Sequence, residues 1–485
     1  MLIRMSNTDE SEEKSLERHF IESTTLHGIP QQWDNARPSW LRGFWFLAFF
    51  ACLGTGLWQI SLRIAEYRAY LANTKITLEY NNELQFPAIT ICNFNRYRGS
   101  EVSDEDWPYL EYALFAEEYD YDSYEDDGKF EQSSFSYYAL FENSTFNFTE
   151  FTRRAGFVLD NETLLDCKWR GRPCYAENFT HVFTSYGNCW TFNNGVDEDG
   201  NYIEILSEDQ PGAGNGLYLV VDIQQAEYTE SLQGNPQAGL KILAHDQEAP
   251  PLMDALGSAI PPGFYSYISL RRNKYKNLQE PWGKCDKNRH LEHYWEYTLS
   301  GCFIECKLQH IVSECGCRPV RYPGEATECS PRQSATCVKD VIARLNDGIL
   351  EPCYCPVPCQ YIEYSTTVSY GAFPSQSVAE EAEAHFNVSV DYQRNNFVVL
   401  DVFYEELNYQ RFEQQKAISV SSLISDIGGN LGLFIGASIL TFAEFIDYFV
   451  KKSLKVCTSR KNQAKEKGHP LGNKVKDVWS VSKSS

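Results

Sequence analysis

Two long apolar runs, one near each end of the chain, constrain the fold more than any other feature. The first, GFWFLAFFACLGTGLWQISL, covers Gly43 to Leu62, and the second, LGLFIGASILTFAEFIDYFV, covers Leu431 to Val450. A helix rises about 1.5 Å per residue, so about 20 residues cross the roughly 30 Å hydrocarbon core of a bilayer. The first run begins too far into the chain for a cleaved signal peptide. We therefore predict a membrane protein with two transmembrane helices, over residues 43–66 and 419–450.

Charge and glycosylation signals orient these spans. The tail after Val450 carries ten lysines and arginines against Glu466 and Asp477, which is typical of a cytoplasmic segment. With two spans, the leader then lies on the same side. Five glycosylation sequons all lie between the runs, at Asn143, Asn147, Asn161, Asn178 and Asn387. We expect a plasma-membrane protein with a cytoplasmic leader (1–42), an extracellular region (67–418) and a cytoplasmic basic tail (451–485).

The extracellular region has the composition of one disulfide-rich domain. Fourteen of the 16 cysteines lie in it, which in an oxidising compartment allows seven disulfides and leaves Cys52 and Cys457. Strand-like runs (FPAITICNF, GLYLVVDIQQAEY, NFVVLDVFY) alternate with helical stretches such as Ser375–Phe386. The predicted class is a large α+β ectodomain with a β core. The formal charge of −23 lies mostly in this region, where it attracts cations, protons or basic ligands.

Catalytic and metal-binding motifs are missing from the sequence. Neither HExxH nor G-x-S-x-G occurs, and the nine histidines have no spacing typical of a metal site. Nothing in the composition points to nucleic acid as a partner. We expect a protein that is not an enzyme and that has no cofactor or metal.

The second run carries polar residues that a simple lipid-facing helix would avoid. At about 100° per residue, one stripe of small residues ends in a carboxylate: Ser425, Gly429, Gly432, Gly436, Ala443 and Asp447. Gly432 and Gly436 form a G-x-x-x-G pattern, which also fits close helix packing. Glu444 and Asp447 favour a water-filled pore, because carboxylates are costly against lipid.

Ser438 adds a geometric condition to the pore hypothesis. It lies about 200° around a straight helix from Gly436, so both can face one axis only if the helix breaks at Gly436-Ala437-Ser438. A broken backbone at membrane depth is tolerated where its carbonyls line a cavity. Two spans cannot enclose such a cavity, so several chains must assemble around an axis.

Several motifs together resemble the degenerin and epithelial sodium channel family, most closely its acid-sensing branch. They are HGIP at 27–30, FPAITICN at 86–93, PWGKC at 281–285, VLDVFYEELNYQ at 399–410, DIGGNLGLFIGAS at 426–438, and the order of the loop cysteines. The resemblance implies a sodium-preferring, amiloride-sensitive channel that forms a homo- or heterotrimer with related subunits. It covers nearly the whole chain.

The resemblance also implies roles for individual residues. Gly436, Ala437 and Ser438 would form the selectivity belt, and Ser425, Asp426, Gly429, Gly432, Glu444 and Asp447 would line or gate the pore. His27 and Gly28 would act in gating, and Tyr70 and Trp282 would couple the first span to a cysteine-rich arm. The implied bridges are Cys92–Cys189, Cys167–Cys174, Cys285–Cys359, Cys302–Cys355, Cys306–Cys353, Cys315–Cys337 and Cys317–Cys329.

Departures from the acid-sensing pattern concern the stimulus. Leu71 and Ala72 replace expected histidines, Gln210 replaces an expected lysine, and Lys339 and Ala343 replace expected acids facing the uncharged Ser231–Asn235 stretch. A crowded carboxylate pair senses protons because crowding raises one pKa, and that crowding is gone here. Other acids, such as Glu413 or Asp426, remain candidate titrating groups.

We therefore expect a channel opened by an extracellular peptide or by protons. Two alternatives remain, a non-conducting receptor or adhesion subunit of the same fold, and a mechanically gated channel. The intact Gly-Ala-Ser belt favours a conducting protein over the first, whereas the sequence offers no feature specific to mechanical gating.

Overall fold

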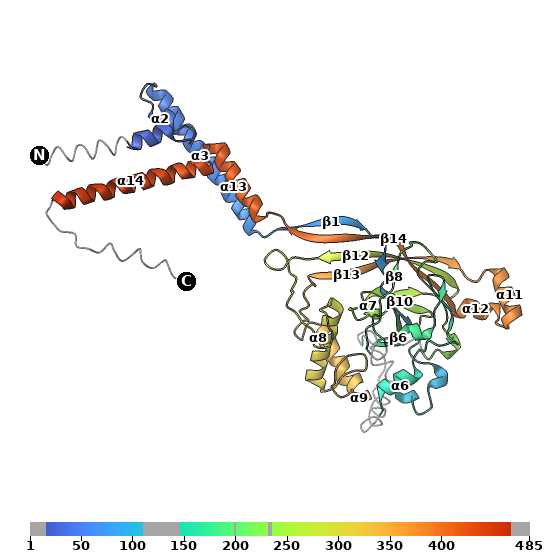
Figure 1. Cartoon of the computed structure of the whole chain (residues 1–485). Coiled ribbons are helices and arrows are strands. Elements are labelled where there is room, and N and C mark those ends of the chain that lie inside the picture. Colours follow the sequence, from blue (N-terminus) through green and yellow to red (C-terminus); the bar gives the residue numbers. More distant parts are fainter. Residues whose placement is uncertain (1–15, 110–145, 198–199, 231–234, 467–485) are drawn as a thin grey trace, which may run out of the picture. The chain divides into compact units, whose positions relative to one another are not determined.

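The computed structural model describes residues 16–109, 146–197, 200–230 and 235–466, with side chains as far as Thr458. These described residues form two compact units, one made of those up to Asn73 together with those from Lys416 on, and one made of those between Thr74 and Gln415. Figure 1 shows the helices of the first unit and the sheets of the second. Asn143, the Ser231–Gly234 part of the expected facing stretch and the tail beyond Glu466 lie outside the described residues.

The first unit holds both candidate membrane spans. Among the described residues, α3 (Ser39–Arg68) is long and apolar enough to cross a bilayer, and only 6% of its apolar window is buried. The second candidate is the pair α13 (Val420–Ile435) and α14 (Ile439–Glu466), bent by 74° at the break between them. Helix α3 is longer than the predicted span at both ends and α14 is longer at its C-terminal end, because backbone hydrogen bonding continues into the flanking polar residues.

Close packing joins α3 to α13 within this unit. A Cβ added at Gly56 of α3 would lie 3.3 Å from Cβ of Phe434 in α13, so glycine permits the approach. Two short helices of the leader complete the unit, one over residues 16–23 and α2 (Ile29–Trp33).

Two sheets form the core of the second unit. Within the described residues, the strand order of the first sheet is β13-β12-β14-β9-β4-β5, with β1 also paired to β14. The strand order of the second sheet is β11-β10-β3-β7-β6. Strands β12 and β14 pair in parallel, and the other neighbours whose register is given pair antiparallel. The first sheet contains β1 (Ala72–Tyr80), β4 (Leu164–Trp169), β5 (Arg172–Pro173), β9 (Leu217–Asp222), β12 (Phe264–Lys276), β13 (Gln360–Ala372) and β14 (Phe397–Lys416). The second contains β3 (Ala88–Asn93), β6 (Phe179–Thr184), β7 (Gly187–Phe192), β10 (Leu240–His245) and β11 (Ser258–Ile260), and β2 (Leu84–Gln85) pairs with β8 (Ser207–Glu208) apart from both.

Apolar side chains from both sheets fill one core. Leu219 of β9 and Leu400 of β14 are fully buried, as are Ile89 and Ile91 of β3. The three strand-like runs predicted from the sequence are therefore confirmed as β3, β9 and β14. All three are rich in β-branched and aromatic residues that fit a buried pleated surface.

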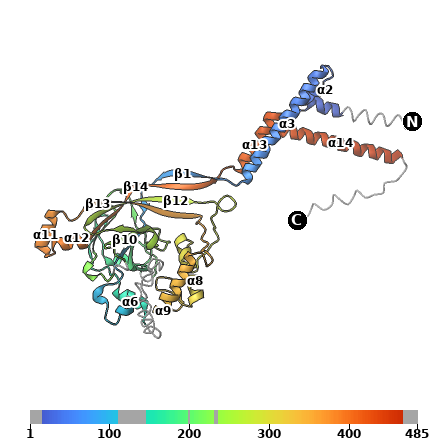
Figure 2. The same cartoon turned by 180° about the vertical axis from the view of Figure 1, so that it is seen from behind.

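Helices lie on two opposite sides of the sheets, as Figure 2 shows from behind. On one side are α11 (Gln376–Phe386) and α12 (Val390–Asn396), and on the other is a cysteine-rich arm of α8 (Leu299–Cys315), α9 (Pro331–Gln333), the π-helix η5 (Ser334–Val338) and α10 (Lys339–Asn346). The remaining short elements are η1 (Gly99–Glu101), α6 (Phe148–Ala155), η3 (Ala176–Asn178), η4 (Gln225–Glu227) and α7 (Met253–Leu256).

Seven disulfides form among the described cysteines, and they match the seven implied pairs. Two each join neighbouring strands of a single sheet, β3 to β7 (Cys92–Cys189) and β4 to the end of β5 (Cys167–Cys174). Five lie in the arm or at its base (Cys285–Cys359, Cys302–Cys355, Cys306–Cys353, Cys315–Cys337 and Cys317–Cys329). Cys52 and Cys457 stay free, since all 16 cysteines lie in the described part of the chain. The expected disulfide-rich, β-cored ectodomain is confirmed.

Candidate functional site

The second span breaks at the Gly-Ala-Ser sequence. Helix α13 ends at Ile435, and Gly436 follows with φ of 69°, in the left-handed region where glycine has no steric cost. The Gly436 amide donates to the carbonyl of Gly432 at 3.1 Å, and the Ala437 amide donates to that of Leu431 at 3.2 Å. The first of these bonds, from the glycine just past the helix to the carbonyl four residues earlier, is that of an αL helix end. The break that we predicted at this sequence is present.

Ser438 begins the helix that follows. The Thr441 amide donates to Ser438 Oγ at 3.3 Å, and the Ser438 amide donates to Thr441 Oγ1 at 3.1 Å. This reciprocal pair resembles a capping box and satisfies amides that a helix start leaves open. The predicted belt is therefore a short loop between two well-capped helix ends.

A segment of the leader docks at this break. The His27 amide donates to the carbonyl of Ile435 at 3.0 Å, and the His27 ring lies against Gly436. Gly28 is buried with φ of 87°, and a Cβ there would lie 3.7 Å from Trp45 and 3.8 Å from Phe49 of α3. The motif therefore packs against the break in the second candidate span, and the cytoplasmic location of the leader stays a prediction.

Glu444 of α14 is held by the same segment. Its Oε2 accepts hydrogen bonds from the Thr25 amide at 3.1 Å and from Thr24 Oγ1 at 3.3 Å. Thr25 Oγ1 also pairs with Thr441 Oγ1 at 2.6 Å. Sequence reasoning missed Thr24 and Thr25 of the leader and Thr441 of α14, because a threonine by itself gives no signal of what it contacts. Their hydroxyls offset the cost of placing a carboxylate within a span.

The other predicted pore residues lie along α13 and α14. Asp426 approaches Arg63 of α3, with 3.8 Å between carboxylate and guanidinium, and Asp447 pairs with Lys451 at 2.5 Å. Ser425 and Gly429 are exposed within this single chain. Gly432 makes no close helix contact, since its added Cβ would meet only the Ala437 carbonyl at 3.8 Å. Within the described chain, the tight helix approach uses Gly56 and not the G-x-x-x-G pair.

A ladder of charges crosses the strands β1, β14 and β12 in the β-rich unit. Glu79 accepts from Arg411 at 3.1 Å and from the Tyr409 hydroxyl, while Glu413 accepts from Lys276 at 2.8 Å. The Tyr409 hydrogen bond, followed by Arg411, holds the pKa of Glu79 below its usual value. Lys276, with help from Arg411, likewise lowers the pKa of Glu413. Glu413 was suggested as a proton sensor; its paired cations favour the ionised carboxylate, and the suggestion stays a prediction.

For some buried acids the pKa is raised and not lowered. Burial raises the pKa values of Glu208, Asp222 and Asp401. Asp222 accepts from the Tyr392 hydroxyl at 2.9 Å, and Asp401 accepts from the Gly214 amide at 3.0 Å. Protonation of these groups therefore begins nearer to neutral pH than for an exposed carboxylate.

The positions that depart from the acid-sensing pattern are partly described. Lys339 begins α10 and Ala343 is exposed on it, while Gln210 is exposed after β8. Leu71 and Ala72 follow Tyr70, which has φ of 51°, and all three are exposed. Tyr70 belongs to the helical unit and Trp282 to the β-rich unit, so each is placed by its own unit only.

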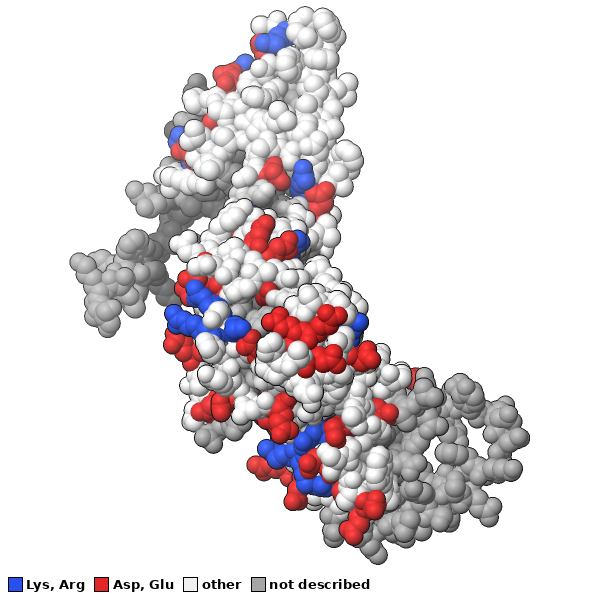
Figure 3. Space-filling model, turned by 90° about the vertical axis from the view of Figure 1, so that its right-hand side faces the viewer, with Lys and Arg blue, Asp and Glu red and all other residues white. Residues whose placement is uncertain are grey.

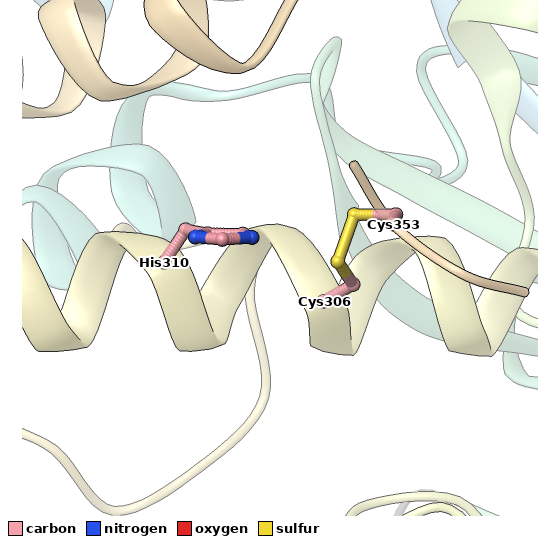
Figure 4. A group of neighbouring side chains, drawn as sticks. All are labelled: Cys306, His310 and Cys353. Carbon is pink, nitrogen blue, oxygen red and sulfur yellow. A yellow bond between two sulfur atoms is a disulfide. The ribbon is translucent and has the colours of Figure 1, made fainter. Parts of the chain in front are cut away.

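One trio in the arm has the residue types of a soft-metal site. Atoms of Cys306, His310 and Cys353 lie within 4.8 Å of one another. Figure 4 shows the two sulfurs joined in a disulfide beside the His310 ring. A disulfide has no thiolate to offer a metal, so this trio is a crosslink. It agrees with the expectation that the arm cysteines bridge.

The surface carries both kinds of charge. Figure 3 shows acidic and basic side chains close to one another on the visible face of the β-rich unit, whereas the visible face of the helical unit is mostly uncharged, with a few charged side chains. Four sequon asparagines are described, and Asn147, Asn161, Asn178 and Asn387 are all exposed. Accessible sequons agree with an extracellular face, though their use for glycosylation stays a prediction.

Comparison with known proteins identifies the family. The family described as amiloride-sensitive sodium channel matches residues 20–448, which include both spans and everything between them. The chain belongs to the amiloride-sensitive sodium channel family. This family assignment confirms the resemblance read from the motifs, and with it an ion channel of the membrane and not an enzyme.

Several members of the family are similar over most of the chain. The human bile acid-sensitive ion channel is 35% identical over 458 residues, covering 92% of this chain and 88% of its own. Acid-sensing ion channel 1 of Gallus gallus is 37% identical, covering 88% and 82%, and human acid-sensing ion channel 2 is 34% identical, covering 92% and 88%. A solved proton-activated chloride channel aligns with a TM-score of 0.31 at 8% identity, covering 85% of this chain and 96% of its own, and this likeness carries no argument.

Proposed function

We propose that the chain is a subunit of a sodium-selective, amiloride-sensitive cation channel of the plasma membrane. The observation that carries this proposal is the break in the second span, where three belt residues separate two capped helix ends. A non-helical backbone segment at membrane depth is stable where its polar groups face a water-filled path. One chain offers too few spans to enclose such a path, so the proposed assembly is a trimer, homomeric or with related subunits.

In this proposal, each predicted pore residue has a position along the ion path. Gly436, Ala437 and Ser438 form the selectivity belt, between Ser425, Asp426, Gly429 and Gly432 on α13 and Glu444 and Asp447 on α14. His27 and Gly28 act in gating, because the segment they belong to contacts both sides of the break. Tyr70 and Trp282 are proposed to couple the arm to the first span, with support from the resemblance alone.

The proposed stimulus is an extracellular ligand, either a peptide or protons. In the β-rich unit Glu79 pairs with Arg411, and the Tyr409 hydrogen bond together with Arg411 lowers the pKa of Glu79, which does not favour it as the proton-responsive group. If protons open the channel, the buried Asp222 and Asp401 are better placed to respond, because burial raises their pKa values. The name of one relative, the bile acid-sensitive ion channel, adds an amphipathic organic acid to the ligands worth testing.

The test is voltage clamp of oocytes that express the chain alone. Currents are recorded under acid, a peptide panel and bile acids, with and without amiloride, and the reversal potential is compared in sodium and potassium. We expect an amiloride-sensitive current that reverses near the sodium potential. Ser425→Phe should hold the gate open, whereas Ile424→Phe, at the exposed neighbouring position on α13, should not.

Several outcomes would contradict the proposal. Surface expression without current under any stimulus, and without current in Ser425→Phe, would favour a receptor or adhesion subunit. Current that appears only under membrane stretch would favour mechanical gating. Equal permeability to sodium and potassium would exclude sodium selectivity.

A further inference from the structure

A histidine is buried at the end of β10, in a place that ion conduction does not explain. The His245 side chain is only 9% exposed. It lies beside Thr90 of β3, which is fully buried, and Thr90 lies beside Thr191 of β7, which is 2% exposed. Histidine is the side chain whose ordinary pKa lies closest to physiological pH, so its burial ties this part of the sheet to one protonation state.

Three hydrogen bonds fix which nitrogen of His245 carries the hydrogen. Its Nδ1 lies 2.9 Å from the carbonyl oxygen of Asp246, which can only accept, so Nδ1 donates. Nε2 of a neutral ring is then an acceptor, and the Thr90 hydroxyl donates to it at 2.8 Å. Thr90 Oγ1 in turn accepts from the Thr191 hydroxyl, also at 2.8 Å. This relay across three strands therefore requires a neutral imidazole.

Protonation of His245 would reverse the relay. A hydrogen on Nε2 makes that nitrogen a donor, so Thr90 would have to accept from it and donate to Thr191. Within the described chain, Thr191 Oγ1 has no other hydrogen-bond partner, so its own hydrogen would be left without an acceptor. A buried unpaired donor and a buried charge both cost free energy.

The surroundings of His245 favour the neutral ring. Burial lowers the pKa of the imidazole to about 4, against a smaller opposing effect of nearby backbone carbonyls. The charged and titratable groups around this corner are Asp246 and Glu248 of the same segment, Arg272 of β12 and Tyr364 of β13. Strands β3 and β7 face it with threonine hydroxyls. Among the described residues, no side-chain carboxylate bonds to the imidazole, so acid acts against the relay.

The pairing of the strands decides which part of the sheet can separate. The Cys92–Cys189 disulfide ties β3 to β7. Strand β10 pairs with β3 on one side and carries β11 on the other. Neither β10 nor β11 contains a cysteine. The boundary between β10 and β3 is therefore held by hydrogen bonds and packing alone.

We propose that β10 and β11 form an acid-released edge of the second sheet. Proton uptake by His245 breaks the relay to Thr90, and β10 together with β11 parts from the disulfide-tied β3 and β7. Native proteins open locally in this way at a lower cost than global unfolding. The release acts on the β-rich unit whatever stimulus opens the pore, so the inference does not rest on conduction.

Hydrogen exchange of the full-length protein in nanodiscs, read by mass spectrometry, tests the release. Exchange is compared at about pH 7 and about pH 5, after correction for the intrinsic effect of pH on amide exchange. The open edge returns His245 to its ordinary pKa of 6.5 and therefore binds more protons than the closed edge, whose pKa is about 4. The opening constant should then rise about 20-fold between the two conditions. Protection should fall in β10 and β11 and stay unchanged in β7.

Two variants separate His245 from other effects of acid. His245→Asn cannot take up a proton, so the acid effect should disappear, whereas His385→Asn, at an exposed histidine of α11, should keep it. Thr90→Val removes the donor to Nε2 and destabilises the neutral ring, so the edge should open at higher pH than in the wild type.

Four results would overturn the proposal. They are equal protection of β10 at both pH values, an equal loss of protection in β7 and β10, an acid effect that survives in His245→Asn, and an unshifted pH profile in Thr90→Val. The wild-type pattern and Thr90→Val decide the question even where His245→Asn does not fold.

Discussion

Replacing Gly436 by alanine should displace the leader from the break. Gly436 has φ of 69°, and a Cβ there would lie 2.7 Å from two carbon atoms of the His27 ring. The left-handed backbone costs a residue with a Cβ about 1 to 2 kcal/mol. Displacing His27 also breaks its amide bond to Ile435, worth about 0.5 to 1.5 kcal/mol. The docked state should therefore lose about 1.5 to 3.5 kcal/mol, which lowers its population ratio roughly 10- to 400-fold.

Labelling kinetics can measure this change. Leu26, next to the bond that is lost, is only 8% exposed, so a Leu26→Cys thiol should react with a maleimide only when the segment undocks. Cys52→Ser and Cys457→Ser remove the other free thiols. Gly436→Ala should raise the labelling rate at least tenfold, a lower bound set by the smallest cost above. Gly54→Ala is the matched control, because a Cβ at Gly54 of α3 meets open space.

A double-mutant cycle separates steric contact from backbone strain. In a His27→Ala background the ring is gone, so Gly436→Ala should cost only the backbone part, and the coupling between the two sites should be about 1 kcal/mol. The sodium-to-potassium permeability ratio should fall in Gly436→Ala. If Gly436→Ala labels at the same rate as Gly54→Ala and keeps wild-type selectivity, then neither the contact nor the belt role is correct.

Three further predictions concern the β-rich unit. Arg411→Gln should raise the pKa of Glu79 toward its ordinary value. A lowered carboxyl pKa stabilises the folded state, and this stability is lost as pH falls through the pKa, so in this variant the acid limb of the unfolding or current profile should move to higher pH. Cys92→Ala should cost about 2 to 5 kcal/mol and reduce surface biotinylation sharply, whereas Cys457→Ala in the tail should not. Asn387→Gln should increase gel mobility by one glycan, a difference that peptide N-glycosidase should abolish.

Local patterns predicted the membrane helices and the break. Two apolar runs predict two spans whatever the rest of the chain does, and the opposed directions of Gly436 and Ser438 predict a break from helix geometry alone. The pairing of 14 cysteines was available only through the family resemblance, because sequence spacing permits many connectivities.

Contacts between distant segments could not be predicted. Glu79 and Arg411 are 332 residues apart, and their meeting depends on the pairing of β1 with β14, for which neither strand carries a local signal. Docking of Thr24 and Thr25 on Glu444 spans even more sequence, 420 and 419 residues. Such contacts depend on how the whole core packs. Sequence patterns within windows of ten to twenty residues carry no information about them.

The capped end of α13 has a consequence for cations. The carbonyl end of a helix carries a partial negative charge of about half an elementary charge, without any carboxylate. Of its last carbonyls, that of Gly432 accepts from Gly436 and that of Ile435 accepts from the His27 amide of the leader. Undocking of the leader frees the Ile435 oxygen, so the number of oxygen atoms that the break can offer to a dehydrating ion changes with the position of the leader.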